Sequence, residues 1–145
     1  MLGQFLVGSA ASACNITIHA LVMAVVIQAA RVVSAKAIWS QSLLLIRTMI
    51  ATVLVLMAAH TFEVIVWALV YFLADAAPAG AGLVYFAFVN YTTLGYGDII
   101  PVERWKLLGP ITAMNGVLLF GWSTAVIFEV LRKALARGYL AGPLR

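Results

Sequence analysis

Three long apolar runs follow one another along this chain, at about residues 5–30, 43–73 and 107–131. Each exceeds the ~20 residues that a helix needs to cross a bilayer, so the pattern predicts three membrane-spanning helices. The first run also contains polar residues, so it either spans the membrane or lies at its surface. These polar residues are Ser9, Ser12, Asn15, Thr17, His19 and Gln28.

The stretch between the second and third runs has a different pattern. Residues 74–82 form a turn-rich link of Ala, Gly and Pro, and residues 83–91 are apolar and aromatic. Nine residues make a helix of only ~14 Å, which reaches partway into a membrane. A Gly- and Thr-rich stretch follows and ends at Pro101. Irregular backbone at membrane depth is tolerated only where protein surrounds it or where it lines a water-filled path, so this stretch indicates a pore.

The composition supports a membrane protein. Of 145 residues, 65% are hydrophobic and 10% are charged, whereas a soluble domain has roughly 25% charged residues. The net charge is +4, but the basic residues flank the apolar runs and form no patch, so we expect no nucleic-acid partner. The single cysteine, Cys14, lies in an apolar run, and we interpret it as a small buried side chain.

The basic residues predict the orientation. They lie in the link between the first two runs and after the third run, and both places belong on the cytoplasmic side by the positive-inside rule. The N-terminus and residues 75–106 are then outside. The small size and the lack of appended domains favour a bacterial inner membrane. The basic residues concerned are Arg31, Lys36, Arg47, Arg132, Lys133, Arg137 and Arg145.

Residues 92–98 read Thr-Thr-Leu-Gly-Tyr-Gly-Asp. Gly95 and Gly97 can adopt left-handed backbone conformations, and alternating handedness lets successive carbonyl groups point the same way. A row of carbonyl oxygens can replace the water around a monovalent cation. Thr93 adds a hydroxyl oxygen, and we expect Tyr96 to brace the loop against the aromatic residues of the short helix.

This segment resembles the selectivity filter of the potassium channel family, in which Val is usual at the position of Leu94. The resemblance covers about residues 45–132, and the chain as a whole looks like small bacterial channels with an extra N-terminal span. It implies an all-α membrane protein with an N-terminal helix and link (1–40), a pore domain (41–132) and a short tail (133–145). Four chains then assemble as a fourfold channel.

The resemblance also implies roles for individual residues. Potassium is bound by the carbonyl groups of Thr93, Leu94, Gly95 and Tyr96 and by the Thr93 hydroxyl, within an ion-binding segment that ends at Gly97. The residues implied as filter support are Thr92, Asp98, Tyr85 and Phe86, and those implied at a gate or cavity are Gly116, Gly121, Thr124 and Glu129.

Several residues have more than one interpretation. Gly116 and Gly121 are either hinges or sites of close helix packing. Thr124 lines a cavity or bonds to a neighbouring helix, whereas Asn115 lies on a different face. Glu129 forms a ring of charge at the inner mouth or an ion pair with Arg132 or Lys133.

Other predictions concern buried polar groups. Some members of the family have a carboxylate at the position of Val89, so here Asp98 needs another donor, either Trp105 or Tyr85. His60 and Glu63 are three residues apart and share a helix face. We interpret them, with His19, as packing groups rather than pH sensors. Two histidines without a thiolate also have poor spacing for a metal site.

The predicted function is passive, potassium-selective conduction by a homotetramer surrounded by lipid. The permeant K⁺ is the only ion or cofactor expected, and the sequence contains no catalytic motif. No series of basic residues marks a voltage sensor, so a regulatory domain would belong to a separate subunit. The alternatives are a nonselective monovalent cation channel and a non-conducting membrane subunit that modulates a partner.

Overall fold

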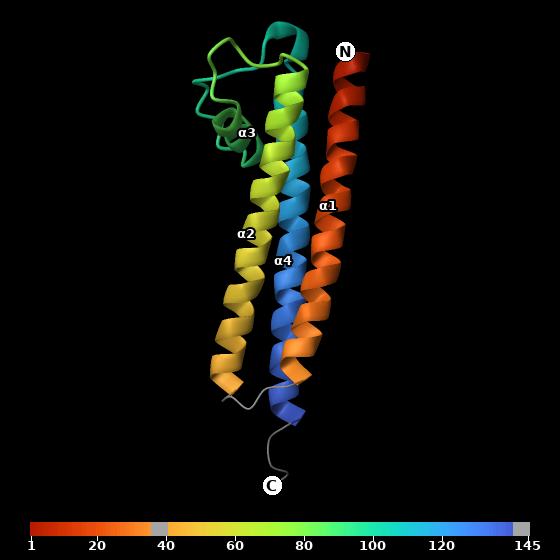
Figure 1. Ribbon diagram of the computed structural model, residues 1–145, viewed down its shortest axis with the longest axis vertical. Helices are drawn as coiled ribbons and strands as arrows, with labels where there is room; N and C mark the ends of the chain where they lie inside the picture. Colours follow the sequence, from red (N-terminus) through yellow and green to blue (C-terminus); the bar gives the residue numbers. More distant parts are fainter. Residues whose placement is uncertain (36–40, 141–145) are drawn as a thin grey trace.

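The computed structural model describes residues 1–35 and 41–140, which form three long helices side by side with a short helix and a loop at one end (Figure 1). Within this part of the chain every regular element is helical, so the all-α prediction is confirmed. The elements are α1 (Leu2–Ala35), α2 (Gln41–Leu73), α3 (Leu83–Tyr91), the 3-10 turn η1 (Glu103–Trp105) and α4 (Leu108–Leu140).

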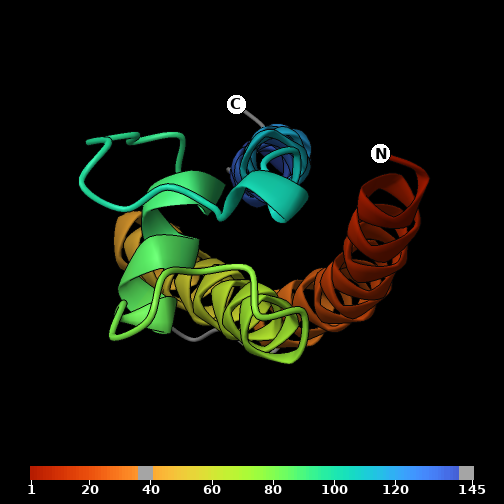
Figure 2. The same cartoon turned by 90° about the horizontal axis from the view of Figure 1, so that it is seen from above.

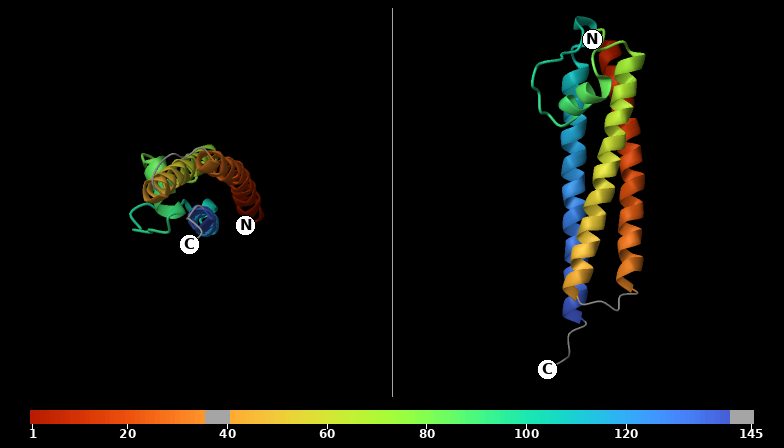
Figure 3. Two further views of the ribbon diagram at one scale, coloured as in Figure 1. Left: turned by 90° about the horizontal axis from the view of Figure 1, so that it is seen from below. Right: turned by 60° about the vertical axis from the view of Figure 1, so that its left-hand side comes forward.

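Within the described residues, three stretches are long and apolar enough to cross a membrane, namely Leu2–Ala29, Ser42–Leu73 and Glu103–Ala136. They coincide closely with the three apolar runs of the sequence. Helix α1 lies alongside α2 and α4 rather than across them (Figures 1 and 3). This arrangement favours the spanning interpretation of α1 over a position flat on the membrane surface.

Helices α1 and α4 run in the same direction, and α2 runs opposite to both (Figure 1). The N-terminus therefore lies at the same end as α3 and its loop, while α4 ends at the opposite end. Seen from the end that carries α3, this short helix and its loop lie on one side of α2 and α4, and the N-terminal half of α1 lies on the other (Figure 2). Lys36 and Arg145, two of the residues used to predict the orientation, lie outside the described residues.

Aromatic residues form the core between α2 and α3. Trp67, Tyr71, Phe86 and Tyr91 are fully buried, and the rings of Tyr71 and Phe86 lie 4.8 Å apart. Such ring pairs contribute ~0.5–1.5 kcal/mol beyond the area that they bury. They hold α3 against α2, which determines where the following loop begins.

Polar side chains join α1 to the other helices. Asn15 Nδ2 donates to the Glu63 carbonyl and to Asn115 Oδ1, both at 3.2 Å. Trp67 Nε1 donates to the same Asn115 oxygen at 3.0 Å. One amide oxygen of α4 thus accepts hydrogen bonds from both α1 and α2.

The prediction that Cys14 is buried is wrong, because its side chain is exposed on the single chain. The buried stripe of α1 follows a spacing of four residues through Ala11, Asn15 and His19, as expected for the face of a helix that packs on neighbours. Cys14 lies one position away from that stripe and faces outward.

We predict that Asn115→Leu lowers the unfolding free energy in detergent by about 1–2 kcal/mol, because Asn15 and Trp67 lose their shared acceptor in an apolar interior. The control is Met114→Leu, at a neighbouring position that is 60% exposed. Chemical unfolding of both variants measures the difference. Equal stability of the two variants would contradict a contribution from these bonds.

Candidate functional site

The loop after α3, residues 92–98, alternates in backbone handedness. Thr93, Gly95 and Gly97 have φ angles of 60°, 58° and 78°, and the residues between them are not left-handed. The left-handed conformation predicted for both glycines is confirmed. Thr93 was not foreseen, because a residue other than glycine pays about 1–3 kcal/mol there. A conformation this costly must be held by its surroundings.

The C-terminal end of α3 supplies part of that support. The Val89 carbonyl accepts hydrogen bonds from the amides of Leu94, at 3.0 Å, and Gly95, at 3.5 Å. The Thr92 hydroxyl donates to the Phe88 carbonyl at 2.7 Å. The loop therefore turns back over the last turn of the helix, and its first residues occupy carbonyl groups that a helix end otherwise leaves free.

Asp98, at the far end of the loop, is tied to the beginning of α3. The Tyr85 hydroxyl donates to Asp98 Oδ2 at 2.8 Å, so of the two donors proposed from the sequence Tyr85 is the partner. The bond to this carboxylate raises the pKa of Tyr85, which keeps the hydroxyl protonated as a donor. Both ends of the loop are thus fastened to one short helix.

Two further residues, Tyr96 and Phe86, were predicted to support the loop. Tyr96 is 69% exposed and Leu94 is 53% exposed on the single chain, so the bracing role of Tyr96 stays a prediction. Phe86 is buried against Tyr71 of α2 and so supports α3 rather than the loop. Every residue from Thr92 to Asp98 is exposed on the single chain.

The two glycines of α4 differ in their surroundings. A side-chain carbon on Gly116 would lie less than 3.0 Å from the carbonyl oxygen of Tyr91, the last residue of α3. Gly121 has open space around it. The structure therefore favours close packing as the reason for glycine at position 116.

Thr124 and Glu129 lie nearer the other end of α4. Thr124 is exposed and donates to the Phe120 carbonyl at 2.9 Å, while Asn115 is buried, so the two do lie on different faces. Glu129 accepts hydrogen bonds from Arg132 at 2.8 and 2.9 Å and pairs with Lys133 at 2.9 Å. The ion-pair alternative is thus present at Glu129, within one helix.

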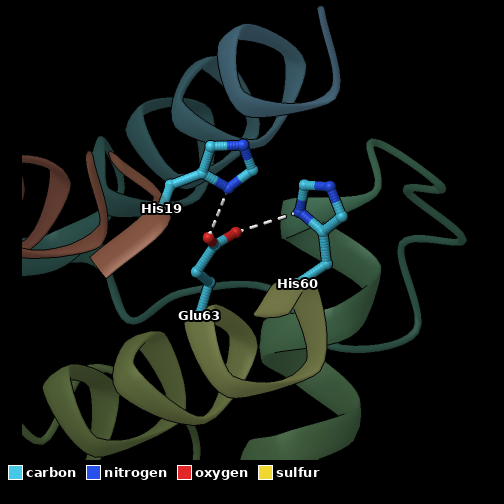
Figure 4. A group of neighbouring side chains, drawn as sticks. All are labelled: His19, His60 and Glu63. Carbon is cyan, nitrogen blue, oxygen red and sulfur yellow. Dashed lines mark hydrogen bonds and ion pairs between the residues drawn. The ribbon is translucent and has the colours of Figure 1, made fainter. Parts of the chain in front are cut away.

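A buried polar cluster lies where all four helices meet (Figure 4). Glu63 lies 2.8 Å from His19 Nδ1 and 2.9 Å from His60 Nδ1, so the predicted pairing of His60 with Glu63 is confirmed. Tyr91 of α3 donates to the same carboxylate. Ser123 of α4 lies within hydrogen-bond distance of both histidines.

Spacing along the chain argued against a metal site at these histidines, but the fold brings them together with Glu63. One ligand atom each from His19, His60 and Glu63 lies within 4.8 Å of the others. Tyr91 and Ser123 were missed as members of the cluster. The available signal was a polar residue within each apolar segment, since such residues are costly in a membrane and tend to pair.

We predict that Gly116→Ala lowers the melting temperature in detergent, because the added methyl group displaces the Tyr91 carbonyl immediately before the loop. Gly121→Ala is the control. It has room for the methyl group and gains up to ~1 kcal/mol of helix propensity. If both variants had the same melting temperature, close packing would not explain the glycine at position 116, and a hinge would be the better explanation.

One of three comparisons with known proteins identifies a family. Searches of curated proteins and of solved structures find no match. A family model described as ion channel matches residues 16–133, which include most of α1, all of α2 and α3, the loop and most of α4. That range is well over half of the chain, and it includes all of one candidate membrane span, Ser42–Leu73, and parts of the two others. The chain is therefore a member of this ion channel family and an integral membrane protein.

Proposed function

We propose that four copies of this chain form a potassium-selective channel whose filter is the loop of residues 92–98. The observation that carries the proposal is the left-handed backbone at Thr93, Gly95 and Gly97, alternating with Leu94 and Tyr96. In this alternation successive carbonyl groups can face one axis. Rings of such carbonyl oxygens replace the hydration shell of K⁺ in channels.

The ion sites use the carbonyl groups of Thr93, Leu94, Gly95 and Tyr96 and the Thr93 hydroxyl. These groups carry partial charges only, so each site binds K⁺ weakly enough to release it to the next. Leu94 offers the same backbone oxygen as the usual Val. The C-terminal end of α3 carries the negative end of its dipole and favours a cation near the start of the loop.

The proposed homotetramer follows from the number of filter loops in each chain. One chain has one such loop, and a closed ring of oxygens requires a cyclic assembly. The exposure of the whole loop on the single chain supports this proposal, because a strained segment with exposed Leu94 and Tyr96 gains its missing contacts from neighbouring subunits. The apolar outer face of α2, which includes Ile65, Leu69 and Phe72, is suited to lipid.

The proposed orientation has the N-terminus and the filter outside and the C-terminus in the cytoplasm of a bacterium, across its inner membrane. The positions of Arg132 and Lys133 support it, because these basic residues lie near the end of α4 remote from the filter. Conduction is passive and uses no cofactor, and regulation by a ligand-binding domain would come from a separate subunit. Thr124 and Gly121 are the exposed α4 positions proposed to face the inner cavity.

We predict that the purified protein in liposomes gives currents that reverse near the potassium equilibrium potential under opposed K⁺ and Na⁺ gradients. Gly95→Ala should abolish this selectivity, because φ of +58° is unfavourable for alanine. Gly80→Ala is the matched control. Its φ is +79°, it also has open space, and it lies in the link before α3, so it carries similar backbone strain outside the filter.

Three other outcomes would contradict the proposal. Equal permeation by Na⁺ would make the protein a nonselective cation channel. An assembled protein with no current under any condition would favour the non-conducting modulatory subunit. A loss of selectivity in Gly80→Ala as large as in Gly95→Ala would mean that general backbone strain, and not the filter, explains the effect.

A further inference from the structure

The buried cluster closes into a ring of hydrogen bonds. Glu63 faces the Nδ1 atoms of His19 and His60, at 2.8 and 2.9 Å (Figure 4). On the other side, the Ser123 hydroxyl lies 2.9 Å from His60 Nε2 and 3.3 Å from His19 Nε2. Each histidine thus has Glu63 at one ring nitrogen and Ser123 at the other. The ring joins α1, α2 and α4.

Counting donors shows that this ring needs one proton more than two neutral histidines provide. An ionised carboxylate only accepts, so both Nδ1 atoms carry a hydrogen and both Nε2 atoms of neutral rings would be acceptors. Ser123 has one hydroxyl hydrogen and can donate to only one of them. The ring closes when the other Nε2 is protonated and donates to Ser123 Oγ. If the extra proton is on Glu63 instead, the ring still needs the same total number of protons to form its four hydrogen bonds.

The cost of a net charge in this buried cluster also favours one extra proton. His19 and Glu63 have no exposed surface and Ser123 is 5% exposed, so a net charge here is costly. The net charge of the ring is −1 without the extra proton, zero with it and +1 when a second extra proton binds. No other Asp, Glu, His, Lys or Arg occurs in the facing segments, residues 2–30, 48–73, 83–91 and 108–128. Tyr91 is the one further titratable group in contact with the cluster in the described part of the chain.

A divalent metal ion fits this geometry less well than a proton. Ligand atoms of a tetrahedral zinc site lie about 3.3 Å apart, because the metal–ligand distances are about 2.0–2.1 Å. The 2.8 and 2.9 Å separations between Glu63 and the histidines are hydrogen-bond distances instead. A divalent ion with one carboxylate would also leave a net charge of +1 in the apolar interior.

We propose that this ring is a proton-binding site through which pH controls conduction. The link to the filter is Tyr91, the last residue of α3, whose hydroxyl donates to Glu63 and lies 2.9 Å from His60 Nδ1. A second proton gives the ring a net charge, and when it resides on Glu63 Oε2 that oxygen becomes a donor, so Tyr91 can no longer donate to it. The end of α3 is then released one residue before the filter begins, and conduction falls. This regulatory role rests on the proposed channel function.

The same geometry provides a path for the proton. When His19 Nε2 gives its proton to Ser123 Oγ, Ser123 can give its own hydrogen to His60 Nε2, so the positive charge moves from one ring to the other without loss of a proton. His60 has 15% of its side chain exposed, whereas His19 and Glu63 have none. Exchange with the surroundings therefore takes place at His60.

The number of protons bound by the ring can be measured without recording ion currents. The chain has two histidines, so ¹⁵N-histidine and ¹³C-glutamate solid-state NMR of the protein in bilayers can assign each ring, with His19→Gln and His60→Gln identifying the signals. At neutral pH we expect three protons in total on the four ring nitrogens and the Glu63 carboxyl, including one on a single Nε2. Two protons in total, with both Nε2 atoms bare, would overturn the proposal.

The coupling is tested by K⁺ flux from liposomes between about pH 8 and pH 5, where histidine titrates. We expect flux to fall severalfold on acidification, and we expect no pH response in Glu63→Gln. Tyr91→Phe should keep three protons by NMR but lose the flux response. Tyr71→Phe is the matched control and should keep the response, because its buried hydroxyl bonds to Thr112 at 2.7 Å, outside the ring.

An unchanged pH response in Tyr91→Phe, or an equal loss in Tyr71→Phe, would overturn the coupling. Flux that is insensitive to pH but blocked by zinc ions, restored by a chelator and unaffected by zinc in His19→Gln, would replace the proton site with a metal site. Absence of K⁺ flux at every pH would count against the proposed channel function instead, and the NMR proton count would still decide whether the ring binds its proton.

Discussion

The structure depends on one constraint, that polar groups within the apolar bundle must find their partners inside the protein. Lipid offers no hydrogen bonds, and an unpaired group costs several kcal/mol. Glu63 meets this requirement through bonds from three helices. Asn15 and Asn115 meet it in part, through bonds that cross from one helix to another, while Asn15 Oδ1 and Asn115 Nδ2 have no partner among the described residues. The same groups that would otherwise destabilise the bundle therefore determine how its helices align, and close apolar packing fills the space between them.

Tyr91 connects the three features on which the proposed function depends. It ends α3 and precedes the exposed loop, its carbonyl lies against Gly116 of α4, and its hydroxyl donates to Glu63 of α2. Movement of any of these partners acts on the start of the loop through one residue. The left-handed conformations at Thr93, Gly95 and Gly97 are unfavourable on their own, so they persist only while this end of α3 is held in place.

Helix α1 is bonded to the same helices that position α3 and its loop. Its Gln4 side chain accepts a hydrogen bond from the Leu107 amide at 2.8 Å, near the start of α4. Asn15 and His19 lie on the same stripe further along and bond to α2 and α4. The family match begins at residue 16, within this helix. A span that looks like an addition in the sequence is thus part of the structure that supports α3 and the loop of residues 92–98.

The sequence by itself determined the three spans, the short helix at residues 83–91 and the left-handed glycines of the loop. Those features follow from local hydrophobic length, from the position of the link and from the lack of a side chain at Gly95 and Gly97. It also paired His60 with Glu63, because residues three apart share a helix face.

Only the tertiary structure decided which distant residues meet. His19 is 44 residues from Glu63 and joins it from another helix, and Gly116 is glycine because the end of α3 lies against it. The outward side of Cys14 and the burial of Phe86 against α2 likewise depend on which stripe of each helix faces its neighbours. An apolar run that is hydrophobic on all sides does not reveal that stripe, because in a membrane both the lipid-facing and the buried sides are apolar.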